Sequence, residues 1–177
     1  MQRVTDILLM LAVAVLSAPV IPNRAFVAAA SPTENASGQS LAIIVNQSNS
    51  IENLSFEDLR RVFFGEQSHW PNGRRITLVM TGPGQPERRV VLRDIYRMDE
   101  KDFNKHVLQG MFTGEIFVPP KTLATSLEVR KFVFNVPGAI GFVRTADVDG
   151  SVKVIRVDGR LPDDKEYKLR MDARSGK

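Results

Sequence analysis

Residues 129–143 read VRKFVFNVPGAIGFV, and this stretch decides the fold because a helix pattern passes directly into a strand pattern. The apolar residues of its first half recur at the spacing of one helical face: Val129, Phe132, Val133 and Val136. Pro137 and Gly138 then favour a tight turn, since proline cannot continue a helix and glycine tolerates a positive φ. Residues 139–143 are almost unbroken in their apolar character, which is typical of a strand covered on both faces. Gly141 within that strand indicates a close neighbour.

The same stretch resembles a known family. Residues 135–143 (NVPGAIGFV) are similar to the Asn-Pro-Gly-Ala-Ile-Gly-Tyr-Val segment of phosphate-type solute-binding proteins of ABC transporters. Residues 54–65 (LSFEDLRRVFFG) resemble the helix that leads to Phe-x-Gly in that family, and Trp70 follows as the family's tryptophan does. The resemblance covers residues 41–157 and implies the type II periplasmic binding-protein fold, in which two lobes normally hold the ligand between them.

The order of expected elements gives the fold class. We predict strands and helices at these places: strand 41–45, helix from Ser55, strand 75–80, helices from Pro86, Asp99 and Thr125, and strands 139–143 and 152–157. The prediction is an α/β domain over residues 41–177, a three-layer sandwich resembling one lobe of a type II periplasmic binding protein. The expected mature chain is about half the usual length for that family, and one lobe alone cannot enclose a small anion from both sides.

The amino terminus has the pattern of a secretory signal peptide, residues 1–30, which implies a periplasmic location. Arg3 precedes an apolar run, residues 7–16, and residues 28–30 (AAA) offer a small-residue cleavage site. The run is shorter than the roughly 20 residues that span a bilayer, and an uncleaved anchor is the alternative. Residues 31–40 (SPTENASGQS) are small and polar, so we expect a flexible leader.

An anion site is expected where residues 82–86, GPGQP, follow a strand and open a helix. The candidate ligand-binding residues are those of the glycine loop and the first helical turn: Gly82, Gly84, Gln85, Arg88 and Arg89. Backbone N–H groups and the helix dipole both favour an anion there, and the two arginines can add a bidentate grip on phosphate. The alternative is that both arginines are solvated on a basic outer face of the helix.

This loop departs from the family's pattern. The family usually has Gly-Ser-Gly-Thr here, whose hydroxyls contact the anion, whereas this chain lacks them and Pro86 removes one N–H donor. Ser126 begins the helix after a capping box of Thr125 and Glu128, at a terminus where the resemblance implies a ligand. One hypothesis is therefore capture of phosphate or another oxyanion for an ABC importer. The other is an exported interaction or sensor module that keeps the fold without a small ligand.

Composition excludes several other functions. The formal net charge is +4, from 24 Lys and Arg against 20 Asp and Glu, and the two signs are interspersed, so nucleic-acid binding is not indicated. There is no cysteine, and His69 has no partner at metal-ligand spacing, so no metal site is expected. Neither a nucleophile elbow, nor a His-Glu-x-x-His motif, nor a P-loop occurs, so no catalytic residue, cofactor or enzymatic activity is expected. The expected partner is an ABC transporter permease or another exported protein.

Two further expectations concern the middle and the end of the chain. The helix that Asp99 caps is expected to close at Gly110. Three of its apolar residues are expected to face inward: Phe103, Val107 and Leu108. Residues 111–120 have the composition of an irregular apolar loop that must pack on the domain or on a partner. Residues 152–157 alternate like an edge strand, and the chain from Asp158 onward shows no clear pattern.

Overall fold

The computed structural model describes residues 40–116 and 118–171. The expected signal peptide lies outside the described residues, and so does the expected leader apart from Ser40. Among the residues that are described, no helix has the length and the hydrophobicity that a membrane span requires.

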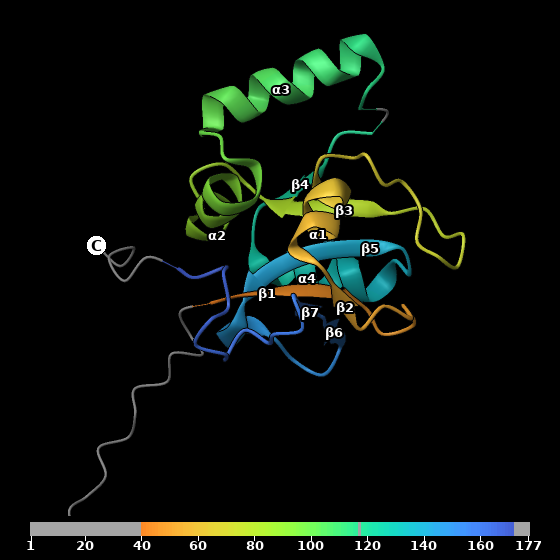
Figure 1. Cartoon of the computed structure of the whole chain (residues 1–177), viewed down its shortest axis with the longest axis vertical. Helices are drawn as coiled ribbons and strands as arrows, with labels where there is room; N and C mark the ends of the chain where they lie inside the picture. Colours follow the sequence, from red (N-terminus) through yellow and green to blue (C-terminus); the bar gives the residue numbers. More distant parts are fainter. Residues whose placement is uncertain (1–39, 117, 172–177) are drawn as a thin grey trace, which may run out of the picture. The chain divides into compact units, whose positions relative to one another are not determined.

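A five-stranded mixed sheet forms the middle layer of the domain (Figure 1), in the order β4-β3-β5-β1-β6. Its strands are β1 (Leu41–Asn46), β3 (Thr77–Thr81), β4 (Lys121–Leu123), β5 (Ala139–Arg144) and β6 (Val152–Val154). Strand β3 runs parallel to β4 and β5, while β1 runs antiparallel to β5 and β6. A small second sheet pairs β2 (Asn53–Leu54) with β7 (Arg156–Val157) in parallel.

Helices cover both faces of the five-stranded sheet. They are α1 (Phe56–Phe63), α2 (Pro86–Val91), the π-helical turn η2 (Leu92–Tyr96), α3 (Glu100–Thr113), α4 (Ser126–Asn135) and the short η3 (Thr145–Asp147). Alternate residues of β1 enter two separate cores, Leu41, Ile43 and Val45 with α1 and α2, and Ala42 and Ile44 with α4. The predicted three-layer α/β architecture is therefore confirmed.

Of the four α-helices in the described part of the chain, three begin with a side-chain cap, as their sequences predict. Ser55, Asp99 and Thr125 each accept a hydrogen bond from the backbone N–H three residues later, over 3.0, 2.8 and 3.2 Å. Each cap satisfies one of the N–H groups that a helix start leaves without a partner. Helix α2 begins differently, because its N-cap residue Gln85 makes no such side-chain bond.

The turn before β5 depends on a close approach rather than on an unusual dihedral angle. Gly138 does not have a positive φ, which corrects the reason given for it from sequence. A Cβ atom at Gly138 would overlap the backbone oxygen of Arg75. The carbonyl of Gly138 also accepts hydrogen bonds from Trp70 Nε1 at 3.0 Å and from the Thr77 N–H at 3.1 Å. Glycine is required here because the loop before β3 lies directly against this turn.

Helix α3 is longer than the sequence predicts. It passes through Gly110 and ends at Gly114, which has a φ of 77°. Gly110 is instead a packing position, since a Cβ atom there would lie 2.6 Å from Ile116 Cγ1. The expectation that Leu108 faces inward is wrong, because 56% of that residue is exposed, whereas Phe103 is buried as predicted.

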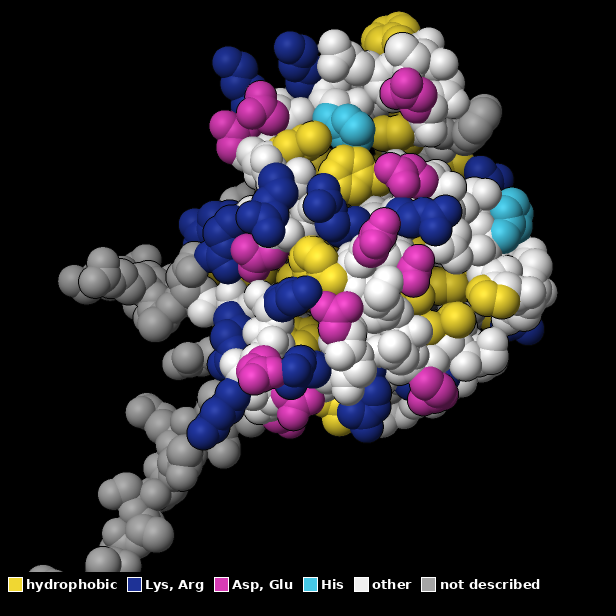
Figure 2. Space-filling view, in the orientation of Figure 1, with side chains coloured by type: hydrophobic (Ala, Val, Ile, Leu, Met, Phe, Trp, Pro, Cys, Tyr) yellow, Lys and Arg dark blue, Asp and Glu magenta, His cyan; other side chains and the backbone are white. Residues whose placement is uncertain are grey.

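The end of the domain also differs from expectation. The predicted single strand 152–157 is interrupted at Ile155, so that β6 joins the large sheet and β7 joins the small one. The segment beyond it contributes Tyr167 and Leu169 to the core, and the Leu41 N–H donates to the Leu169 carbonyl over 2.9 Å. On the face shown in Figure 2, Lys and Arg side chains are interspersed with Asp and Glu.

Gly138→Ala is expected to lower the free energy of unfolding by at least about 2 kcal/mol, because the new methyl group forces the backbone of β3 away from β5. Urea denaturation measures this loss. The control is Gly150→Ala, since a Cβ atom at Gly150 meets no atom within 4 Å, and its effect should stay within about 0.5 kcal/mol. Equal midpoints for the two variants would contradict the close-approach argument.

Candidate functional site

The predicted site residues gather at the carboxyl edge of β3 and β4. Thr81 and Leu123 are paired at the ends of these parallel strands, and the chain continues from them into α2 and α4. The Gln85 side-chain amide reaches the Ala124 carbonyl at 3.5 Å. The structure thus brings the Gly82–Gln85 loop beside the helix start that carries Ser126. Ligands of open α/β sheets bind at such an edge.

The loop leaves backbone donors at the start of α2. Gly84 has a φ of 83°, and the Gln85 N–H closes the turn on the Gly82 carbonyl over 3.4 Å. Pro86 occupies the first helical position, where its missing N–H costs nothing. No side chain caps the N–H groups of the first turn, so they are available to water or to an anion.

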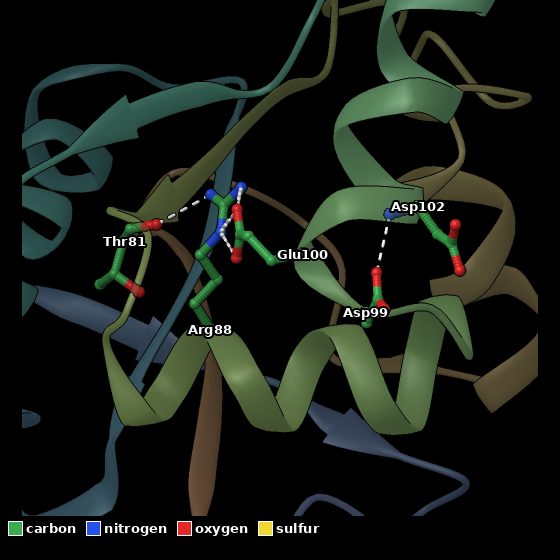
Figure 3. Close-up of polar contacts among 5 residues, drawn as sticks. All are labelled: Thr81, Arg88, Asp99, Glu100 and Asp102. Carbon is green, nitrogen blue, oxygen red and sulfur yellow. Dashed lines mark hydrogen bonds and ion pairs between the residues drawn. The ribbon is translucent and has the colours of Figure 1, made fainter.

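Arg88 turns into the protein rather than toward this loop (Figure 3). It is 3% exposed. Its guanidinium holds both carboxylate oxygens of Glu100 at 2.8–3.1 Å and donates to the Thr81 carbonyl over 3.0 Å. The same group lies 5.0 Å from the centre of the Phe103 ring. The expectation of a solvated outer-face arginine is wrong for Arg88, and in this conformation its donors serve an internal ion pair.

A second acidic–basic pair lies in the first turn of α2. Glu87 is buried, and Arg144 from the end of β5 donates to its Oε1 atom. Glu87 Oε2 and Thr81 Oγ1 are both buried, and neither finds a hydrogen-bond partner among the described residues. Arg144 offsets the charge of Glu87, so this carboxylate alone does not decide the sign of the electrostatic potential at the loop.

Arg89 and Ser126 remain accessible. Arg89 is exposed and forms no ion pair within residues 40–116 and 118–171. Ser126 is half-buried at the first position of α4. The Thr125 half of the predicted capping box is confirmed, because Thr125 accepts from the Glu128 N–H; Glu128 accepts over 2.8 Å from the N–H of Ala124, one residue before the N-cap, rather than from that of Thr125.

The sequence did not reveal the partners of Arg88. Glu100 is twelve positions away, and no helical or strand periodicity connects the two residues. They meet because Arg97 adopts a left-handed conformation, with a φ of 58°, and turns the chain back into α3. Within the described ranges, no group of three or more His, Cys, Asp or Glu side chains could hold a metal ion.

No protein-family model matches the chain. Solved structures of phosphate-binding proteins do share its fold. A putative phosphate ABC transporter substrate-binding protein with bound phosphate from Clostridium perfringens aligns with a TM-score of 0.58 and 18% identity, over 72% of this chain and 49% of that chain. An ABC-type phosphate transport receptor from Vibrio cholerae aligns with a TM-score of 0.56 and 21% identity, over 72% of this chain and 50% of that chain. PstS from Borrelia burgdorferi aligns with a TM-score of 0.58 and 12% identity, over 76% of this chain and 55% of that chain.

The chain therefore spans about half the length of these neighbours. At such low identities the likeness establishes the fold alone. It confirms the resemblance to the phosphate-type periplasmic binding-protein fold that residues 54–65 and 135–143 carry, and it fits a short variant of that fold.

Arg88→Ala is expected to lower the free energy of unfolding by about 2–3 kcal/mol, because it leaves Glu100 and the Thr81 carbonyl without their charged donor. Chemical denaturation gives the difference. Arg89→Ala is the matched control one position away, and its exposed side chain should contribute no more than about 0.5 kcal/mol. If both variants unfold at the same denaturant concentration, the ion pair does not support the fold.

Proposed function

Since the chain shares the fold of phosphate-type periplasmic binding proteins over about half their length, we propose that it is an exported solute-binding-like protein. Its ligand is a small oxyanion, with phosphate as the first candidate, held at the carboxyl edge of β3 and β4. The single observation that carries this proposal is the uncapped start of α2 beside the start of α4.

Backbone donors supply most of the proposed site. Helices α1, α3 and α4 each use a side chain to cap an N–H group, whereas the first turn of α2 has none. Helix α2 continues directly into η2, so the helical dipole behind these N–H groups comes from residues 86–96 rather than from six residues. A charge-assisted hydrogen bond from such a group contributes roughly 1.5–3 kcal/mol.

Charge at the site comes chiefly from Arg89, because Arg88 and Arg144 are paired with acids. The loop also lacks the hydroxyl groups of the related Gly-Ser-Gly-Thr loop. Both facts favour a weaker and less selective oxyanion site than a fully enclosed one. Phosphate comes first in the test because the Clostridium perfringens neighbour holds it.

The role that follows is transport rather than catalysis. The neighbours from Clostridium perfringens and Vibrio cholerae are described as parts of ABC-type phosphate transport systems. By analogy, this chain would deliver its anion to a permease, and no catalytic residue is assigned.

A second function, an exported interaction module without a small ligand, is favoured by a different observation. Apolar side chains are exposed on the outer side of α3, with Phe112 84% exposed and Leu108 and Met111 half exposed. Exposed apolar side chains gathered at one place are typical of protein contact surfaces.

Titration calorimetry with phosphate, sulfate and molybdate separates the two functions. We expect phosphate to bind wild type, and the double variant Arg89→Ala with Ser126→Ala to bind it at least about tenfold more weakly, a loss of ~1.4 kcal/mol. Lys131→Ala, on the outer side of α4, is the control for loss of a positive charge and should bind as wild type does.

Equal affinity of wild type and the double variant would place the oxyanion elsewhere. If no oxyanion gives heat with wild type, the solute-binding proposal fails and the interaction module takes its place.

A further inference from the structure

A cavity of about 680 Å³ lies at the amino end of β3, away from the glycine loop that follows its carboxyl end. The end of α1, the start of β3, η2 and the inward side of α3 line it. Its wall includes Phe63, Phe64, Leu78, Tyr96, Phe103 and Val107. Hydrophobic side chains reach the surface in Figure 2 below α3, where that helix meets the rest of the domain. The volume falls within the range of small-molecule sites, about 300–1,000 Å³.

The architecture explains why this space is open. Strand β4 pairs with β3 only from Val79 to Thr81, so the earlier part of β3 has no strand neighbour on that side. Helix α3 lies over the gap. The Arg88–Glu100 pair holds it at its base, and at its far end the chain folds back so that Ile116 packs on Gly110 of the same helix.

The charged side chains that line the cavity, among the described residues, are all positive. None of the described residues that line it is an Asp or a Glu, whereas Arg75 and Lys121 both line it. Both are exposed, and neither forms an ion pair with any described residue. Lys121 Nζ lies 5.3 Å from the centre of the Phe132 ring. A ligand with a negative head group would therefore meet two cations that have no acidic competitor.

One wall residue lacks a polar partner. His106 packs edge-on against Phe64, with ring centroids 5.5 Å apart, and its Nε2 atom is buried without a hydrogen-bond partner among the described residues. Tyr96 is different, because its hydroxyl donates to the Phe63 carbonyl over 2.7 Å and burial raises its pKa well above the usual range. An unsatisfied buried polar group is costly, and the hydrocarbon body of a ligand at this wall would leave that cost in place.

We propose that this cavity binds a free organic carboxylic acid with a hydrocarbon body. The hydrocarbon lies between α1 and α3, and the carboxylate lies beside Arg75 and Lys121. This site is separate from the oxyanion site of the proposed function and does not depend on it.

The charged end is tested by titrating the full folded chain with decanoate and with decanol, both below their aggregation concentrations. Decanoate is expected to bind at one site, at least tenfold more tightly than decanol. Arg75→Ala with Lys121→Ala should weaken decanoate at least tenfold and leave decanol unchanged. Lys131→Ala with Lys165→Ala removes the same charge from exposed positions outside the cavity lining and should change neither affinity.

Substitutions on α3 test the apolar part of the proposed site. Val107→Phe fills the cavity and should weaken both ligands at least tenfold. Leu108→Phe is the matched control, because Leu108 is the next residue on the same helix and faces solvent. Circular dichroism and the melting midpoint establish that each variant is folded, and Gly150→Ala serves as a second folded reference.

Three outcomes would overturn the proposal: no decanoate binding, equal binding by wild type and the Arg75/Lys121 variant, or displacement of decanoate by inorganic phosphate. Retention of full decanoate affinity by Arg89→Ala with Ser126→Ala supports two separate sites. Failure of the oxyanion site would leave the decanoate result unchanged, so the two proposals fail independently.

Discussion

The backbone carbonyl of Gly138 is the contact on which the position of β3 depends. It receives the Trp70 indole N–H and the Thr77 N–H, and the absence of a Cβ atom lets the Arg75 backbone lie against the turn. Strand β3 consequently begins beside β5 with Thr77 opposite Ala139. That register places the glycine loop at one end of β3 and the apolar cavity at the other. Both candidate sites therefore depend on the same tight turn.

Arg88 connects the two ends of this arrangement. Its guanidinium joins the last residue of β3 to the first turn of α3, so the helix over the cavity is held by the residue that the sequence suggested for anion binding. A buried guanidinium needs its acceptors, since an unpaired buried charge is strongly destabilising. Arg88 is thus a structural residue here. The proposed oxyanion site therefore relies on the backbone of the loop and on Arg89.

Structural features that depend on a few neighbouring residues, such as helix caps and periodic segments, could be predicted from the sequence. The caps at Ser55, Asp99 and Thr125 span four residues each, and β1 and the α4–β5 unit follow a clear period. Features that depend on contacts between distant residues could not be predicted in this way. Strand β4 has no buried residue, and Leu169 is buried in a core cluster whose other members come mostly from distant parts of the chain. The position of the glycine loop followed from its neighbours in sequence, whereas the pairing of Arg88 required the turn at Arg97. Oxyanion binding itself stays a prediction.

The place of β1 within the sheet has a consequence for the order in which the chain becomes structured. This strand is the first of the described strands in chain order and is buried along its whole length, whereas its neighbours β5 and β6 begin only at Ala139 and Val152. At its amino end, the Leu41 N–H donates to the carbonyl of Leu169, which lies still later in the chain. Contacts between such distant segments form slowly and leave apolar surface exposed in the meantime. By this topology the ribosome makes most of the described domain before β1 acquires a partner, so the domain folds as one unit rather than strand by strand.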